Sequence, residues 1–303
     1  MSLEADYIVD RRRLKRSLTL WRVVAVVALV GVVIAATGRM KGLGGGDYVA
    51  RLMVTGIILS DAARDKVLAD LSENAKAKAL IVRIDSPGGT VIGGEELYHS
   101  LRQVAGNKPV VAIMGGTATS AAYMTALGAD HIVARPGSVT GSIGVIMQTA
   151  ELTGLLEKLG IKPESIKSRP LKAQPNPLEP LTGEAREASL GVVLDLFEMF
   201  VDMVVERRGL PRSNVLKLAD GRIFTGRQAF ENKLIDALGG EETARQWLSE
   251  THDIADSLPL QDVEISHGKE YWRDLLGGFL GKVLFSERLR LDGPISLWHP
   301  SLW

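Results

Sequence analysis

The stretch "PVVAIMGGTATSAAYMTALGAD", residues 109–130, has the pattern of a buried strand that leads into a helix, with one serine at the junction. The apolar run at its start is typical of a buried strand, and the small residues after the serine fit a helix. Ser120 is therefore expected near a helix N-terminus, where unpaired N–H groups favour a developing negative charge. Neighbouring alanines leave room for a substrate at the hydroxyl. The alternative is that Ser120 only caps the helix.

The stretches on either side predict an α/β fold. Strand-like runs, β-branched or continuously apolar, cover residues 48–59, 79–85 and 109–114. Helical spacing covers residues 61–77 and 93–106. Strands that alternate with helices indicate right-handed βαβ units around a largely parallel sheet.

Composition excludes several classes of protein. The 303 residues carry 36 basic and 36 acidic side chains, so no net charge attracts nucleic acid. The chain has no cysteine, which excludes disulfides and cysteine-based zinc sites. We find no internal repeat, and no cofactor or metal is implied.

The N-terminal region predicts a membrane anchor. Residues 23–36 are uninterrupted apolar or small residues, and "RRRLKR" precedes them. The positive-inside rule then gives a cytosolic basic tail at 1–16, a transmembrane signal anchor at 17–37 and a glycine-rich linker at 38–47, with the remainder outside the cytosol. Alternatives are a cleaved secretory signal and a buried core helix.

Two further segments complete the predicted organisation. A helix over 184–208, capped by Thr182 and ended by Gly209, has apolar residues on more than one face, which suggests packing on its own sheet and on a neighbouring subunit. Residues 256–303 hold an amphipathic stretch and the tail "PISLWHPSLW". That tail is expected to dock on the body's own surface, or else to touch membrane or a partner.

Loops that follow the predicted strands supply the candidate chemistry, because such loops gather at one edge of an α/β sheet. In "DSPGGT", residues 85–90, Pro87 ends strand pairing and Gly88 and Gly89 expose backbone N–H groups, as an oxyanion hole requires. The alternative is a plain tight turn. A third loop, residues 136–145, offers the hydroxyls of Ser138, Thr140 and Ser142.

A nucleophilic serine needs a group that takes its proton. His131 begins an apparent strand, and adjacent Asp130 would point to the other strand face, so a Ser-His-Asp triad is not expected. A neutral, desolvated lysine is the other option. The proline-rich segment 161–182 carries Lys162, Lys167 and Lys172, and the residues alone do not choose among them.

The sequence at this point resembles the signal peptide peptidase A family, bacterial membrane-anchored serine proteases with a serine–lysine dyad, in the short form with one catalytic domain. The resemblance runs from about Tyr48 to about Leu248. It rests on five stretches: "DSPGG", "TATSAAYMTALGAD", "TGSIGV", "IKSRPLKAQPNPLEPLT" and "LADGRIFTGRQAFENKLIDALGG". Two departures, "SAAYM" after the serine and "KAQ" at the base, bear on the shape of the substrate pocket.

The resemblance implies roles for particular residues. Ser120 corresponds to the nucleophile and Lys172 to the general base. Gly88 and the Ala121 N–H correspond to the oxyanion hole, and Ser142 to the hydroxyl that holds the base amine.

The family also implies a fold, an assembly and a substrate. The fold is the Clp protease/crotonase-like spiral of ββα units, here behind one N-terminal transmembrane helix, with residues 48–255 as the serine–lysine protease domain. Members resemble dome-shaped homo-oligomers in which the lysine of one protomer approaches the serine of its neighbour. The implied enzyme is a serine endopeptidase of the bacterial inner membrane, with its catalytic domain on the periplasmic side. It would degrade apolar peptides such as cleaved signal peptides, without metal or nucleotide.

Two other functional classes fit parts of the pattern. An acyl-CoA hydratase or isomerase shares the fold and similar oxyanion glycines, but the predicted export separates it from cytosolic coenzyme A, and no carboxylate pair is placed for proton transfer. A non-catalytic membrane scaffold would make Ser120 a helix cap.

Overall fold

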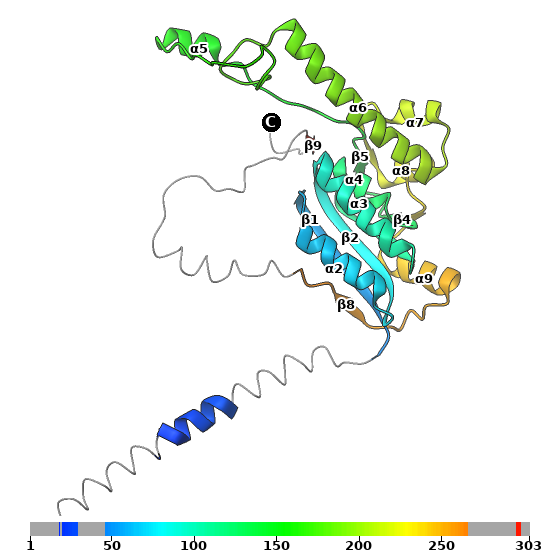
Figure 1. The fold of residues 1–303 in the computed structure, drawn as a ribbon. Coiled ribbons are helices and arrows are strands. Elements are labelled where there is room, and N and C mark those ends of the chain that lie inside the picture. Colours follow the sequence, from blue (N-terminus) through cyan, green and yellow to red (C-terminus); the bar gives the residue numbers. More distant parts are fainter. Residues whose placement is uncertain (1–17, 19, 30–45, 266–294, 298–303) are drawn as a thin grey trace, which may run out of the picture. The chain divides into compact units, whose positions relative to one another are not determined.

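The computed structural model describes residues 18, 20–29, 46–265 and 295–297 (Figure 1). The chain forms two units, residues 1–46 and 47–303. In the first, residues 20–29 are helical, and their apolar side chains are exposed. Within the described residues no helix combines the length and apolar character that a membrane span needs. The structure therefore does not show the expected transmembrane helix at 17–37, most of whose second half lies outside the described residues, as do residues 1–16.

Three long parallel strands form the centre of the second unit. They are β1 (Tyr48–Ile58), β2 (Ala77–Thr90) and β3 (Val110–Thr119), joined by the helices α2 (Ala62–Glu73) and α3 (Val91–Ala105). The run from Leu80 to Val82 is fully buried, as expected for a central strand with both faces covered. The predicted α/β class and its parallel sheet are confirmed.

The sheet divides in the middle of β3. Residues Val111–Met114 pair with β4 (His131–Ala134), and Thr117–Thr119 pair with β5 (Val139–Gly141). Two glycines, Gly115 and Gly116, lie between these two sets. Short strands then extend the sheet: β6 (Ile223–Thr225) on β5, β7 (Ala237–Leu238) on β4 and β8 (Leu260–Asp262) on β1. The division turns the end of β3 toward β5, and Ser120 follows it directly.

The apolar side chains of the second unit form two clusters. The larger one holds Leu52, Leu80, Tyr123 and Phe200 and includes the short helix α4 (Ala121–Ala126). The smaller one packs strand residues such as Val111 against α9 (Glu241–His252). Two more helices, α7 (Arg212–Leu218) and α8 (Gly226–Glu231), follow the long helix α6. Because alternate residues of β2 and β3 contribute to the two clusters, both faces of the central sheet are covered.

The long helix α6 (Gly183–Arg208) begins and ends where the sequence predicts. The Thr182 side chain accepts a hydrogen bond from the N–H of Ala185, and Gly209 ends the helix with φ of 61°. The second half of α6 packs on the core through residues such as Phe200. Its first half projects from the body together with α5 (Thr153–Lys158) (Figure 1). We call residues 151–194, which include α5 and the first half of α6, the arm.

Part of the C-terminal tail docks on the body. Ile295–Leu297 form β9, which pairs antiparallel with Gly88–Thr90 of β2. This agrees with the expectation that the tail docks on the chain's own surface. The predicted amphipathic stretch of the C-terminal region lies outside the described residues.

Candidate active site

Ser120 lies at the junction of β3 and α4 in an unusual backbone conformation. Its φ is 59° and its ψ is −123°, a combination that residues other than glycine rarely adopt. Two backbone hydrogen bonds hold it there: its N–H donates to Gly141 O at 2.8 Å, and its carbonyl accepts from Met124 N–H at 2.9 Å. The surrounding structure therefore fixes a strained serine where a strand meets a helix.

The Ser120 hydroxyl does not cap α4. Ser120 occupies the N-cap position, yet its side chain makes no capping hydrogen bond to the helix. The residue is 1% exposed, and Ala121 and Ala122 beside it are fully buried. A capping serine gains stability from that missing bond, so the geometry favours the nucleophile interpretation over the cap.

The "SPGG" stretch, Ser86–Gly89, is the last part of strand β2 and not the loop that the sequence predicts. The strand runs to Thr90, and Gly88 and Gly89 still pair with β1, so the expectation that Pro87 ends strand pairing is wrong. An irregularity in each neighbouring strand shapes this end of β2. On the β1 side the register shifts between Thr55 and Ile57, at Gly56 with φ of 69°. On the β3 side it shifts between the pairs of Ile84 and Ser86, where Gly115 and Gly116 are extra residues. These shifts move the end of β2 away from regular pairing. The chain therefore does not reverse here; we keep the name "turn" for Ser86–Gly89, although its backbone is extended.

Both glycines of the turn occupy positions that other residues tolerate poorly. Gly88 has φ of 113°. A Cβ on Gly89 would lie 1.9 Å from the carbonyl oxygen of Ile58. The N–H of Gly88 donates to the hydroxyl of Ser86 at 3.1 Å, so this predicted oxyanion donor already has a partner. The Pro87 carbonyl accepts a hydrogen bond from Thr119 at 3.1 Å, which brings the turn beside the residue that precedes Ser120.

The end of β2 has one edge that accepts another strand. Ile57 and Ile58 of β1 pair with Gly88 and Gly89 on one side. Beyond Ser86 no pairing with β3 is described, and β9 takes the other side. An extended segment bound at this edge therefore lies where β3 has diverged from β2. This position is on the side of Ser120.

The three hydroxyl side chains of the third loop, residues 136–145, differ in their hydrogen bonds. Ser138 donates to Gly115 O and Thr140 to Ala118 O, both at 2.7 Å, so these two side chains tie the loop to β3. No hydrogen bond is described for the Ser142 hydroxyl; its residue is half-buried with φ of 51°, and its N–H donates to Arg222 O at 2.8 Å. Of the three, Ser142 is thus available for another partner.

The candidate bases all lie in the arm, and two of them are exposed. Lys162 and Lys172 are exposed, and Lys167 forms an ion pair with Glu179. That pair, in which Lys167 donates to the carboxylate, lowers the pKa of Glu179. The Lys167 amine is therefore already engaged by a carboxylate within the arm. The arm, which carries all three lysines, projects away from the body that holds α4 (Figure 1).

The described histidines have other roles. His131 stacks on Trp247, with ring centroids 4.7 Å apart. This pair lies on the face of the sheet that carries the smaller apolar cluster. Burial lowers its pKa. His99 is 4.0 Å from Glu95, and His252 contacts the edge of Trp247.

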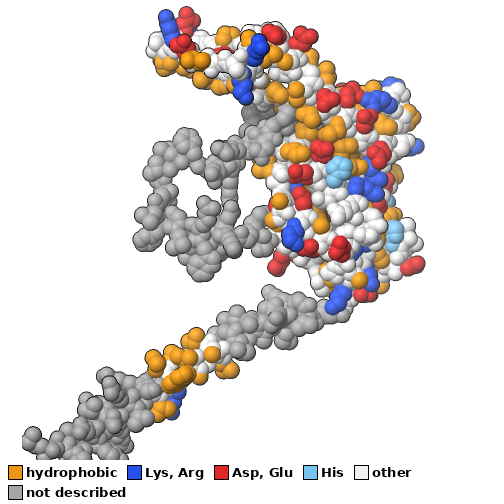
Figure 2. Space-filling model, viewed as in Figure 1, with side chains coloured by type: hydrophobic (Ala, Val, Ile, Leu, Met, Phe, Trp, Pro, Cys, Tyr) orange, Lys and Arg blue, Asp and Glu red, His pale blue; other side chains and the backbone are white. Residues whose placement is uncertain are grey.

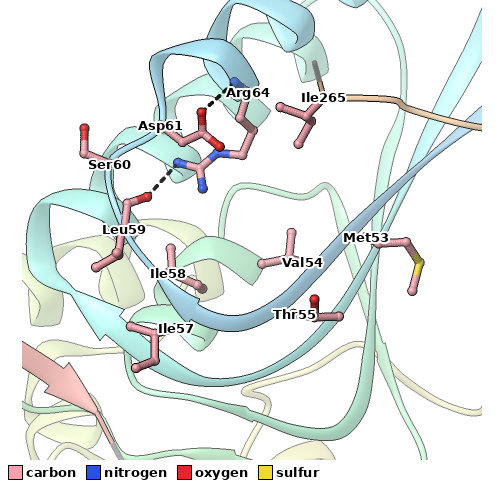
Figure 3. A pocket seen from close by; sticks show the side chains of 10 residues that line it. All are labelled: Met53, Val54, Thr55, Ile57, Ile58, Leu59, Ser60, Asp61, Arg64 and Ile265. Carbon is pink, nitrogen blue, oxygen red and sulfur yellow. Dashed lines mark hydrogen bonds between the residues drawn. The ribbon is translucent and has the colours of Figure 1, made fainter. Parts of the chain in front are cut away.

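A cavity of about 390 Å³ opens at the end of β1 (Figure 3). Apolar side chains, including Met53, Ile57 and Ile58, line most of it. At its polar end the Arg64 guanidinium donates to Leu59 O at 3.3 Å. Because Ile57 and Ile58 pair with Gly88 and Gly89, the cavity flanks the turn on the side opposite β9. It does not include Ser120.

Comparison with known proteins decides the family. The family model described as "Peptidase family S49" matches residues 102–255, and the model "Clp protease" matches residues 50–147. A curated protease of Synechocystis sp. is 41% identical over 233 residues, which are 76% of this chain and 83% of the relative. The chain belongs to peptidase family S49. It is a serine peptidase.

Two further similarities support this assignment and the fold. An Enterococcus faecium protein that carries the name signal peptide peptidase SppA is 31% identical over 195 residues, 64% of this peptidase and 57% of that protein. A solved structure, a mutant of the 1510-N membrane-bound stomatin-specific protease, has a TM-score of 0.50 and 15% identity. It covers 73% of this chain and 100% of that one, which shows a shared fold. The scaffold and acyl-CoA alternatives are thereby set aside.

Two residues of the site were not singled out from the sequence. Ser86 and Thr119 are fully buried, and each bonds the turn that carries the candidate oxyanion glycines. Ser86 directly precedes Pro87 in the "DSPGG" motif, and Thr119 directly precedes Ser120 in the "TATSAAYMTALGAD" motif. Their bonds depend on how β1, β2 and β3 pair, which the order of residues alone does not specify.

Proposed function

We propose that this S49 peptidase hydrolyses peptide bonds with Ser120 as nucleophile and Lys172 as general base. The observation that carries the proposal is the backbone of Ser120, which is strained, buried and joined through Thr119 to a turn rich in potential N–H donors. Strain held in place by surrounding hydrogen bonds is typical of functional sites. A serine used only as a helix cap would have no need of it.

Lys172 would act on the serine of a neighbouring copy. Its segment projects from the body, and its side chain is exposed in the single chain (Figure 1). Exposed apolar residues cover the arm, among them Leu155, Leu159, Leu190 and Leu194, each 49% to 64% exposed (Figure 2). An apolar surface of this kind favours contact with another subunit. Such contact would desolvate the arm and, with it, the lysine amine.

The steps of the reaction follow from these positions. The uncharged Lys172 amine takes the proton of Ser120, whose oxygen attacks the scissile carbonyl. Backbone N–H groups then hold the oxyanion: Ala121 at the start of α4, and one glycine of the turn. Gly88, the donor that the resemblance implies, can take this role only by leaving Ser86, and Gly89 is itself paired with Ile58 of β1 and Ser296 of β9. Lys172 returns its proton to the leaving amine, and water releases the acyl group. Ser142 would hold the lysine amine.

The substrate would be an extended, apolar peptide. The edge of β2 at Gly88–Thr90 already binds an extended segment of the chain itself, β9, in antiparallel register. Peptides commonly bind by adding a strand to such an edge. Cleaved signal peptides have this chemistry, and they are released at the membrane.

The proposal extends to the organisation of the chain. Residues 48–255 would be the protease domain, and 256–303 a C-terminal segment. Residues 17–37 would anchor it in the bacterial inner membrane, with 1–16 in the cytosol, 38–47 as linker and the protease domain on the periplasmic side. The apolar exposed side chains at Leu20, Trp21, Val27 and Leu29 support an anchor.

Mixing two inactive variants tests the shared dyad. Ser120→Ala and Lys172→Ala, each in the full-length protein in detergent, should be inactive on an apolar fluorogenic peptide. If the two groups come from different copies, random mixed oligomers should regain about a quarter of the parental activity, since one site in four combines an intact serine with an intact lysine.

The mixing experiment has a control variant and results that would contradict the proposal. Lys162→Ala is the matched control, because that lysine is exposed in the same segment and should leave activity unchanged. A mixture that stays inactive would exclude a base from the neighbouring copy. Full activity of Lys172→Ala would exclude this lysine altogether.

A further inference from the structure

Two buried hydroxyls hold one peptide unit of the candidate oxyanion turn from opposite ends. The peptide between Pro87 and Gly88 has its carbonyl bonded by the Thr119 hydroxyl, at 3.1 Å, and its N–H bonded to the Ser86 hydroxyl, also at 3.1 Å. Both side chains are 0% exposed. With its carbonyl and its N–H both engaged, this peptide has little freedom to rotate.

Ser86 also connects the turn to β1. Its hydroxyl donates to the carbonyl of Gly56 at 2.6 Å while it accepts from Gly88. Gly56 is the residue at which β1 loses regular register with β2. The hydroxyl therefore replaces backbone pairing that the irregularity removes, and it fixes the turn against a neighbouring strand.

Thr119 connects the same peptide to the nucleophile. It is the last residue of β3 and pairs with Gly141 of β5, whose carbonyl accepts the N–H of Ser120. A shift of Thr119 would consequently move both the turn and the serine. The glycine of the turn and the serine have to lie a fixed distance apart, because an oxyanion donor is effective only within hydrogen-bond reach of the reacting carbonyl.

We propose that Ser86 and Thr119 are positioning residues that fix the oxyanion-binding turn relative to Ser120. This inference rests on the proposed function. Neither side chain touches the substrate: each acts through the Pro87–Gly88 peptide, which fixes the orientation of the glycine backbone in the turn. Their contribution belongs to the transition state, where negative charge develops, and not to binding of the peptide ground state.

Isosteric removal of each hydroxyl tests the proposal in the full-length protein. Ser86→Ala and Thr119→Val should each lower kcat by roughly 10- to 100-fold, below the loss typical of deleting an oxyanion donor, with KM changed less than about threefold. Inhibition by a peptide boronate, whose tetrahedral adduct carries the oxyanion, should weaken by the same factor as kcat/KM. Thr119→Ser keeps the hydroxyl and should retain kcat within about threefold of the parent.

A matched control separates positioning from general stability. Ser72 is 4% exposed, and its hydroxyl donates to Gln103 O and accepts from Asn107, with no described bond to the turn. Ser72→Ala loses similar bonds and should lower the melting temperature as much as the test variants, with kcat within about threefold of the parent.

The outcomes discriminate between the two proposals. Unchanged kcat and boronate affinity in Thr119→Val would overturn the inference while the serine mechanism stands. Equal loss of kcat in the control variant would overturn it as well. If Ser86→Ala does not fold, the comparison of Thr119→Val with Thr119→Ser decides alone. A parent protein with no peptidase activity, identical to Ser120→Ala, would contradict the proposed function itself.

Discussion

Gly89 is the residue of the candidate site that least tolerates an added side chain. An added Cβ would lie 1.9 Å from Ile58 O and 2.6 Å from Ile58 N, and backbone atoms of a central strand cannot move aside at low cost. We expect Gly89→Ala to lower the free energy of unfolding by about 1–3 kcal/mol, as overpacking does, and to abolish peptidase activity because the turn shifts. Chemical denaturation and peptide hydrolysis measure the two effects.

A second glycine provides the control for that substitution. Gly137 has no atom within 4 Å of an added Cβ, and its φ is not in the left-handed region. Gly137→Ala should therefore leave both stability and activity near parental values. If Gly89→Ala were as stable and as active as Gly137→Ala, the close approach of β1 to the turn would be excluded.

His131 makes stability depend on pH. Burial lowers its pKa below the ordinary value of about 6.5, Arg208 lowers it further and Asp236 opposes both. The folded protein then binds this proton less readily than the unfolded chain, so stability is complete above about pH 6.5 and is lost as pH falls toward the lower, folded-state pKa. His131→Phe preserves stacking on Trp247 and removes the titration.

Denaturation of both proteins at several pH values measures this contribution. Between pH 7.5 and pH 5.5 the parent should lose more stability than His131→Phe, up to about 1.4 kcal/mol per unit of pKa difference. Contributions that are common to both proteins cancel in the comparison. Identical pH dependence would mean that His131 is protonated equally well in the folded state.

Among the elements, β9 competes directly with the proposed substrate. It occupies the edge of β2 at Gly88–Thr90 as part of the same chain, at a high effective concentration. Ser296→Pro removes an N–H and disfavours a paired strand, so kcat/KM for an extended peptide should rise several-fold. Ser296→Thr, which keeps the strand, should behave as the parent. Reduced activity of the proline variant would mean that β9 supports the site and does not occupy it.

Prediction from sequence succeeded for elements with a local pattern. The buried run of β2, the cap of α6 at Thr182 and its end at Gly209 depend on residues close in the chain, and the structure confirms them. The irregularities at Gly56 and at Gly115–Gly116 were not predicted, because they arise where strands far apart in sequence pair. For the same reason the sequence suggested the turn and Ser120 as separate candidates, while their connection through Thr119 required the fold.

At the scale of the whole molecule, the uncovered apolar surface of the arm bears on the proposed assembly of copies. The second half of α6 is anchored by buried residues such as Phe200 and Val204, while the first half buries little beyond Ala185. A helix that leaves Leu190 and Leu194 in water has no reason to extend so far unless another subunit covers it. The uncovered apolar arm and the proposed sharing of the dyad between chains would thus have one explanation, the assembly of copies.

Charging the arm tests that explanation. Leu190 and Leu194 are 51% and 49% exposed, so replacing both by glutamate should cost the single chain little stability. In the assembly the carboxylates would be desolvated without partners, and we expect Leu190→Glu/Leu194→Glu to sediment as a monomer and lose at least tenfold in peptidase activity. Leu216→Glu on α7, at a residue 42% exposed, is the control and should keep the parental mass and activity. A monomeric variant with full activity would show that each chain supplies its own base, whereas an inactive monomer with an unchanged melting temperature is what a base donated by the neighbouring arm requires.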